Sequence, residues 1–294
     1  MVRFGAEGGK VALRGHNAST AYESEVVLST NGARRARLNG SALRSAEQLR
    51  QSFRTLVFTP DRLAVVKGAP ATRRAYLDRA LGRLFPSRAS LPVEYAGAVG
   101  QRNAALRRIA AGTSSRDALG PWTEAVAHLG RELVEARVQA VDVLGLCFVE
   151  SAGTLFLAET TLAYEGDVAT VDDYERRLQR DLDRGVTGIG PHLHDVRIEA
   201  SGRDLRSFGS QGEQRVAVLA LVLAEARALA ERDGVRPLVL LDDVLSELDE
   251  SRRIALADLI SAGGQTVVTA TSTAALPSEP ALSLVVTPGT ARSV

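Results

Sequence analysis

Cysteine, lysine and aromatic residues are scarce in this sequence, and long apolar runs are absent. The single cysteine, Cys147, forms neither an internal disulfide nor a metal cluster, and its apolar neighbours predict a buried structural thiol. The longest apolar run begins at Val216 and ends before Glu225, far short of the roughly 20 residues that span a bilayer. No secretory signal is recognisable at the N-terminus. We therefore expect a cytoplasmic protein without a membrane segment.

The charges are nearly balanced, with 36 basic and 35 acidic side chains and a net charge of +1. The whole chain therefore exerts no general attraction on polyanions, and any DNA binding must come from local patches. Lys10 and Lys67 are the only lysines. We interpret the excess of arginine first as genome composition and second as a preference for bidentate phosphate contacts.

The sequence pattern divides the chain into three parts, residues 1–62, 63–184 and 185–294. The first part contains short strand-like segments separated by Asn31-Gly32 and Asn39-Gly40, which predicts an antiparallel meander. The second part has apolar residues at helical spacing, most clearly over residues 126–143, which predicts a helical lobe. The lobe is thus predicted to be an insertion between two parts of one head.

The third part alternates predicted strands with predicted helices. This alternation indicates an α/β fold with a parallel sheet. The strands are predicted at residues 196–200, 238–241, 265–269 and 282–286, and the helices at 211–231 and 250–261.

Two adjacent carboxylates follow the apolar strand predicted at residues 238–241. The carboxyl edge of a parallel sheet is where α/β folds bind ligands. Asp242 is placed to hold Mg²⁺, directly or through water, and Asp243 to orient or deprotonate a water that attacks a γ-phosphate. The alternative is that both residues simply begin a turn after a strand.

A second candidate site precedes the apolar helix predicted at residues 211–231. Ser210 and Glu213 have the spacing of a capping box, with Gln211 and Gly212 between them. Free amides at the start of this helix, with Gly212 permitting close approach, predict an anion site. The alternative is an ordinary capped helix. Asp249 ends a Ser-Glu-Leu-Asp loop that we expect beside a nucleotide and across a dimer contact.

Three motifs in this order resemble the ATP-binding-cassette head. Ser210-Gln211-Gly212-Glu213 resembles its signature, residues 238–243 its Walker B strand, and residues 246–249 its D-loop. The more specific resemblance is to the RecF family of bacterial recombination mediators, and it covers nearly the whole chain. It lies in residues 208–215, 240–249 and 265–271, and further in residues 58–61, 66–70, 73–74, 77–78, 101–103 and 190–192.

This resemblance implies an ATP-binding-cassette-type α/β head with a helical insertion lobe. It also implies a DNA replication and recombinational repair protein that binds ATP and Mg²⁺, dimerises on ATP, binds DNA at gaps and junctions, and helps to load recombinase with a RecR-type mediator during the SOS response. In such a head Asp242 would serve magnesium and Asp243 hydrolysis. Ser210 with Gly212 would bind the γ-phosphate held by the opposite subunit, and Gln211, Glu213 and Asp249 would also belong to the nucleotide site. Thr269 and Thr271 fall where related heads have a switch residue near the γ-phosphate, the alternative being plain strand-end packing.

Two departures from the family pattern limit these implications. The phosphate-binding pattern G-x-x-x-x-G-K-[ST] occurs nowhere, since Gly9-Lys10 is the only Gly-Lys pair and lacks the first glycine and the hydroxyl. We expect that a first βα unit has been lost by truncation or by a late start codon, the alternative being a natural paralogue without the loop. Leu193 and His194 follow the Gly-Pro-His segment at residues 190–192, where the family usually has Arg-Asp, so the role of this segment stays open.

Two other functions compete with an ATP-hydrolysing head. A non-hydrolysing DNA-binding or dimerisation module is favoured by the missing phosphate loop, which makes activity of the chain alone doubtful. A nuclease with Asp242 and Asp243 as metal ligands has little support, because His192 and His194 are the only clustered histidines and no further acidic cluster joins them.

Overall fold

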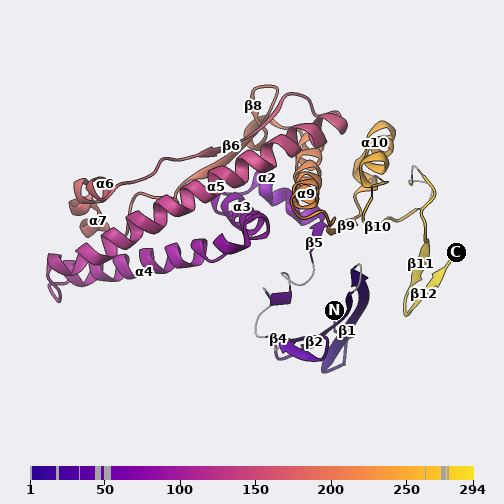
Figure 1. The fold of residues 1–294 in the computed structure, drawn as a ribbon, viewed down its shortest axis with the longest axis horizontal. Helices are drawn as coiled ribbons and strands as arrows, with labels where there is room; N and C mark the ends of the chain where they lie inside the picture. The colour runs from indigo at the N-terminus through magenta and orange to yellow at the C-terminus, as the bar shows by residue number, and fades with distance from the viewer. Residues whose placement is uncertain are drawn as a thin grey trace. The chain divides into compact units, whose positions relative to one another are not determined.

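The computed structural model describes residues 2–17, 20–32, 34–43, 48–49, 54–261, 263–272, 276 and 278–294 (Figure 1). The chain has two compact units, Met1–Thr55 and Leu56–Val294. The predicted helical lobe and the predicted C-terminal part both fall within the second unit, and the division between them at residues 184 and 185 stays a prediction.

The first unit is the predicted antiparallel meander. Its sheet has the order β1 (Gly8–Asn17), β2 (Thr20–Ser29), β3 (Arg34–Leu38) and β4 (Ser41–Leu43), each strand antiparallel to the next. Asn39 and Gly40 have φ values of 49° and 81° and form a tight turn between β3 and β4. Both positions need left-handed backbone, which asparagine and glycine tolerate best.

The second unit contains a three-stranded sheet in the order β10 (Thr266–Thr269), β9 (Leu238–Asp242) and β5 (Thr55–Phe58). β9 and β10 are parallel, as predicted. Two helices follow the predicted ranges closely, α9 (Gln211–Asp233) and α10 (Glu250–Ser261). No helix in the described part of the chain combines the length and the apolar character needed to cross a membrane.

The helical lobe is built around the 35-residue helix α5 (Gly120–Thr154), which confirms the long helix predicted from residues 126–143. α5 packs against α9, which Figure 1 shows foreshortened beside the upper end of α5. Leu77, Leu144 and Leu219 belong to one buried core, so lobe and head share their apolar interior. The remaining described helices of the second unit are α2 (Ala64–Lys67), α3 (Pro70–Leu84), α4 (Leu91–Ala110), α6 (Val171–Arg176), α7 (Leu178–Arg184) and α8 (Leu205–Phe208). Its 3₁₀ turns are η1 (Pro60–Leu63), η2 (Pro86–Arg88), η3 (Arg116–Leu119) and η4 (Leu245–Glu247).

The prediction of one parallel sheet is wrong for the strand at residues 196–200. This strand, β7 (Asp195–Ala200), pairs antiparallel with β6 (Thr160–Glu165) and β8 (Arg203–Asp204) in a separate sheet. β6 lies within the segment predicted to be wholly helical. Its threonines, Leu162 and Tyr164 favour a strand, but six residues between helices are too few for a clear periodicity signal.

The strand predicted at residues 282–286 exists, but it lies in no parallel sheet. β11 (Leu284–Thr287) pairs antiparallel with β12 (Thr290–Ser293), and both strands are exposed. Gly289, with φ of 81°, closes the hairpin between them. Cys147, by contrast, is buried as predicted, and burial raises the pKa of its thiol.

Candidate functional site

Asp242, Asp243 and Thr269 meet at the carboxyl end of the parallel strand pair. Thr269 lies opposite Asp242 in the β9–β10 register. The Thr269 hydroxyl donates to Asp242 Oδ1 at 2.6 Å and accepts the Asp243 backbone N–H at 3.0 Å. One hydroxyl thus orients both predicted acidic residues, a contact that the sequence did not predict.

The backbone at Asp243 is left-handed, with φ of 50°. Aspartate tolerates this conformation better than most residues, but it still costs energy. Ser246 Oγ donates to the Asp243 carbonyl at 2.9 Å and holds the turn. Within the described chain the Asp243 carboxylate has no hydrogen-bond or ion-pair partner, and it lines a small pocket with Arg215, Val218 and residues that follow β5. This carboxylate is therefore available to a ligand.

The Asp242 carboxylate fits a magnesium ligand. Only its Oδ1 accepts a hydrogen bond among the described residues, and its side chain is exposed. Mg²⁺ is usually held by one or two carboxylates together with waters and substrate phosphates, so one exposed carboxylate is a sufficient protein contribution. In the described part of the chain no three His, Cys, Asp or Glu side chains gather as a metal cluster. Asp242 would therefore be the residue to hold Mg²⁺, which would supply positive charge beside a bound phosphate.

The capping box predicted at the start of α9 is present. Glu213 N–H donates to Ser210 Oγ at 3.2 Å, and Ser210 N–H donates to Glu213 Oε2 at 2.7 Å. These hydrogen bonds from Ser210 lower the pKa of Glu213. A side chain at Gly212 would meet no atom within 4 Å, so the helix face at Gly212 is accessible. The helix start can therefore approach an anion closely, with Gln211 exposed beside it.

The loop after Asp243 is anchored by apolar residues and ends in a helix cap. Val244, Leu245 and Leu248 are buried. Asp249 Oδ1 accepts the Arg252 N–H at 2.9 Å and so caps α10. Arg252 also donates through Nε to the Leu155 carbonyl at 3.1 Å, which ties this loop to the end of α5.

The Gly-Lys pair of the sequence is no phosphate loop. Gly9 and Lys10 lie inside the extended strand β1, where Lys10 Nζ pairs with Glu25 Oε2 at 2.6 Å. A P-loop needs a compact turn before a helix, and β1 offers neither.

The Gly-Pro-His segment is held by side chains of the lobe. The Pro191 carbonyl accepts from Arg137 at 2.7 Å, and His192 Nδ1 lies 2.8 Å from the Tyr95 hydroxyl. Burial lowers the pKa of His192. Gly190 has φ of 118°, and a side chain there would stand 2.4 Å from the Tyr95 hydroxyl oxygen, so glycine is required. The segment thus has a structural role despite its departure from the family pattern. Arg137 and Tyr95 have no local sequence signal, because their partners lie far away in the chain.

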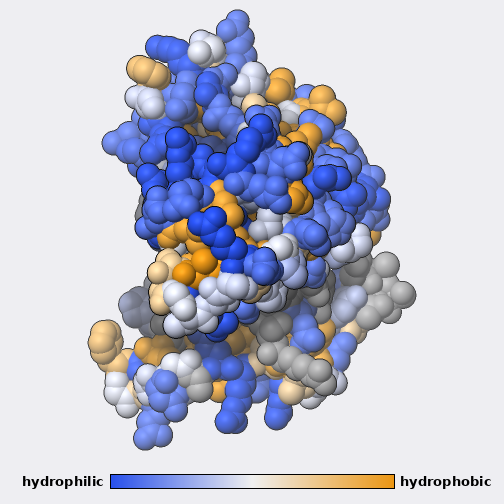
Figure 2. All heavy atoms as spheres, turned by 90° about the vertical axis from the view of Figure 1, so that its left-hand side faces the viewer, coloured by the Kyte–Doolittle hydropathy of each residue, from blue (hydrophilic) through white to orange (hydrophobic). Residues whose placement is uncertain are grey.

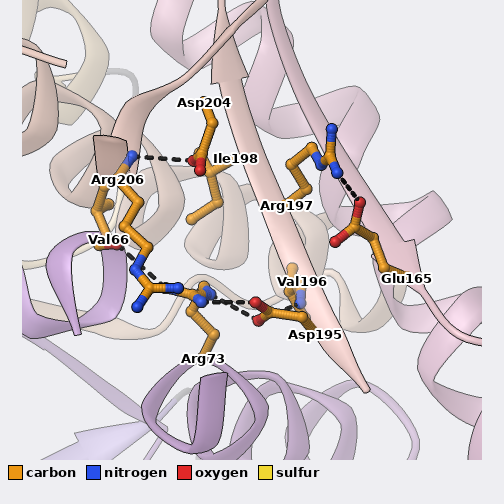
Figure 3. A pocket seen from close by; sticks show the side chains of 9 residues that line it. All are labelled: Val66, Arg73, Glu165, Asp195, Val196, Arg197, Ile198, Asp204 and Arg206. Atoms are coloured by element: carbon orange, nitrogen blue, oxygen red, sulfur yellow. Dashed lines mark hydrogen bonds and ion pairs between the residues drawn. The ribbon is translucent and has the colours of Figure 1, made fainter. Parts of the chain in front are cut away.

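Arg73 and Asp195 face each other in a polar pocket beside β7 (Figure 3). Two hydrogen bonds of 2.7 and 2.6 Å join the guanidinium to the carboxylate. Burial opposes ionisation of Asp195, but the hydrogen bonds from Arg73 and the Val196 N–H, together with the charges of Arg73 and Arg206, outweigh it and lower its pKa. A second pair, Arg197 with Glu165, lines the same pocket. The opposite charges that line this pocket pair with one another, so the pocket offers no net charge to a ligand. The pair of Arg73 and Asp195 joins the lobe to the head.

Curated proteins with one shared name are similar to this chain over most of its length. No model of a protein family matches the chain. The DNA replication and repair protein RecF of Myxococcus xanthus is 33% identical, with 94% of this chain and 76% of that protein covered. RecF of Moorella thermoacetica is 35% identical, with 90% and 73% covered.

Solved structures show the same fold. A structure of the recombination mediator protein RecF with ATP, in the RecFOR pathway, has a TM-score of 0.83 and 24% identity, covering 100% of this chain and 82% of that one. The Smc head domain from Pyrococcus furiosus has a TM-score of 0.54 and 16% identity, covering 98% and 77%. The fold is therefore the predicted ATP-binding-cassette-type head, and the chain belongs to the RecF family of DNA replication and repair proteins.

Proposed function

We propose that this chain is an ATP-dependent repair head whose nucleotide site is shared between two chains. Asp242 and Asp243 serve the nucleotide of their own subunit, while Ser210, Gly212 and Asp249 serve the nucleotide of the partner subunit. Support comes from the family relationship and from an acidic pair, exposed Asp242 and partly buried Asp243, at the carboxyl edge of a parallel sheet.

The distance between the signature and Asp243 within one chain supports the two-chain arrangement. α9 lies against Asp243 at the level of Arg215 and Val218, whereas the signature begins at Ser210. Five to eight residues of helix separate these levels by about 8–12 Å. A hydrogen bond to a phosphate oxygen spans about 3 Å, so one γ-phosphate beside Asp243 is out of reach of the Ser210 of the same chain. This separation supports the proposal that a second chain supplies the signature.

Each residue of the site has a defined task in this proposal. Asp243 orients or deprotonates the attacking water, because its carboxylate has no competing partner in the described chain. Thr269 keeps the two acidic residues in fixed relative positions. A magnesium ion on Asp242 would offset charge on the phosphate oxygens. The α9 start contributes backbone amides and the Ser210 hydroxyl toward the partner's γ-phosphate.

Mixing this chain with a RecF relative that carries a P-loop but has its own signature serine replaced is expected to restore ATP turnover. The relative keeps a complete phosphate loop, and this chain contributes the missing signature. Steady-state phosphate release is measured for the mixture and for each protein alone. Recovery must disappear when Ser210→Arg is introduced here, because the larger cation fills the phosphate position. Turnover that persists with Ser210→Arg would contradict the shared site.

We also propose that the protein binds DNA through arginine–phosphate contacts at the far end of the lobe. In this proposal the protein acts in the bacterial cytoplasm, and its protein partner is a RecR-type mediator. Exposed arginines gather where α4, η3 and α7 meet, and among the described residues none of them pairs with a carboxylate. Figure 2 views this end and shows a mostly hydrophilic surface with a smaller hydrophobic area. The residues are Arg107, Arg108, Arg116, Arg180 and Arg184.

DNA affinity is expected to fall steeply with salt and to change little between two unrelated duplexes, because phosphate contacts release counterions and carry no sequence information. The double substitution Arg108→Ala with Arg180→Ala should reduce the slope of log affinity against log salt by about two. Fluorescence anisotropy across salt concentrations measures this. Arg292→Ala, in the exposed terminal hairpin, is the control and should leave the slope unchanged. Strong discrimination between the duplexes would contradict phosphate-led binding.

A second candidate function is a non-hydrolysing dimerisation or DNA-binding module. It is favoured by the absence of the G-x-x-x-x-G-K-[ST] pattern from the 294 residues. The mixing experiment separates the two functions, since a pure module would bind the partner without restoring turnover.

A further inference from the structure

The C-terminus of α5 has an unusual cap. Leu157 N–H donates to the Ala152 carbonyl at 2.9 Å, and Phe156 N–H donates to the Gly153 carbonyl at 3.0 Å. These are the two hydrogen bonds of a Schellman motif, whose left-handed position is normally occupied by glycine. Here Phe156 occupies it, with φ of 58°. A bulky residue in this conformation is strained, so local backbone energetics do not explain the choice of phenylalanine.

The cap displays the Phe156 ring on the surface. The side chains on either side, Leu155 and Leu157, are 0% and 4% exposed and belong to the shared core, whereas Phe156 is 62% exposed. Burial of both neighbours fixes the backbone, so the aromatic side chain is held outward. Phe156 therefore combines a strained backbone conformation with an exposed aromatic ring that does not pack in the core.

Phe156 stands beside the loop and the helix start that the proposed nucleotide site uses. Arg252 donates to the carbonyl of the preceding residue, Leu155, and pairs with Asp249 at 3.3 Å. The charge of Arg252 also acts on Glu213, where it adds to the larger effect of the Ser210 hydrogen bonds in lowering the pKa. The ends of α5, α9 and α10 thus lie on one face of the second unit.

We propose that Phe156 is an apolar anchor in the contact with a second copy of this chain. The inference rests on the proposed function, because a shared nucleotide site brings the signature and the D-loop of each copy to that contact. Phe156 directly follows Leu155, whose carbonyl binds Arg252, and Arg252 pairs with Asp249 of the D-loop. The face also carries both signs of charge, with Glu213 and Asp249 near Arg203 and Arg252. Mixed charge around one aromatic side chain suits a self-complementary, two-fold contact.

Photo-crosslinking tests which molecule covers this position. Benzoylphenylalanine is introduced at position 156 of the full chain, and at position 146 as the matched control, because Leu146 is 74% exposed on α5, the helix that the Phe156 cap ends. We expect a covalent dimer from position 156 and little or none from position 146. Absence of a dimer from position 156, equal dimer from both positions, or a crosslink to residues of the same chain would each overturn the proposal.

Phe156→Gly separates an interface role from a structural one. Glycine relieves the left-handed strain, so the melting temperature should stay equal or rise. The dissociation constant of the dimer, measured by sedimentation, should increase at least about tenfold, as expected for a central aromatic residue. Leu146→Ala should change neither quantity. A lower melting temperature with unchanged association would show that Phe156 only supports the fold.

The two proposals fail in distinguishable ways. Ser210-dependent ATP turnover that Phe156→Gly leaves unchanged, with no crosslinked dimer, would refute the anchor and keep the shared site. A crosslinked dimer without Ser210-dependent turnover would keep the contact and refute the shared nucleotide site.

Discussion

Replacing Asp243 by asparagine is expected to reduce ATP turnover by about 100-fold or more, the usual contribution of a positioned base. The experiment uses this chain extended by the P-loop segment of a RecF relative. Asparagine keeps the size of the side chain and leaves the N–H bond to Thr269 in place. Nucleotide binding and nucleotide-dependent dimerisation should therefore persist. Phosphate release and nucleotide affinity are measured separately.

Asp242→Asn provides the contrast. This substitution removes the proposed magnesium ligand and the ionised acceptor of the Thr269 hydroxyl, so it should weaken binding of the Mg²⁺–nucleotide complex itself as well as turnover. Equal loss of nucleotide affinity in both variants would contradict the separate roles assigned to the two acidic residues.

Asp181→Ala is expected to destabilise the second unit by about 3–5 kcal/mol, because it leaves the charge of Arg102 buried without its partner. Arg102 donates to Asp181 Oδ2 at 2.8 Å, and their side chains are 1% and 2% exposed. Arg102 also donates to Thr187 Oγ1 at 2.9 Å. Arg102 thus connects α4 with α7 through Asp181 and with the segment after α7 through Thr187. The free energy of unfolding from urea titration measures the loss.

Two further variants establish the cause of that loss. Glu231→Ala removes the carboxylate of an exposed pair with Arg227, at 2.7 Å, and should cost less than about 1 kcal/mol. Replacing both members of the buried pair, with Arg102→Met and Asp181→Leu, should recover part of the stability, since no lone charge stays buried. A double variant as unstable as Asp181→Ala would indicate that lost packing, rather than the unpaired charge, is responsible.

Local patterns predicted much of the fold. The Asn-Gly turns, the long helix α5, the capping box of Ser210 and Glu213, and the strand that ends in Asp242 all follow from short-range rules on turns, periodicity and helix caps. The same rules failed at β6, which is a short strand between helices. They also assigned β7 to the parallel sheet, because strand direction depends on the partner strand and not on the strand's own residues.

The sequence by itself determined the family, the fold class and the identity of the acidic and signature residues, because these depend on motifs of adjacent residues. Only the tertiary structure decided which distant groups meet. It brought Thr269 to both acidic residues, paired Arg73 with Asp195 across 122 positions, and placed Phe156 beside the loop that contains Asp249. Such contacts depend on strand pairing and helix packing, in which side chains far apart in the chain become neighbours, and no local pattern encodes them.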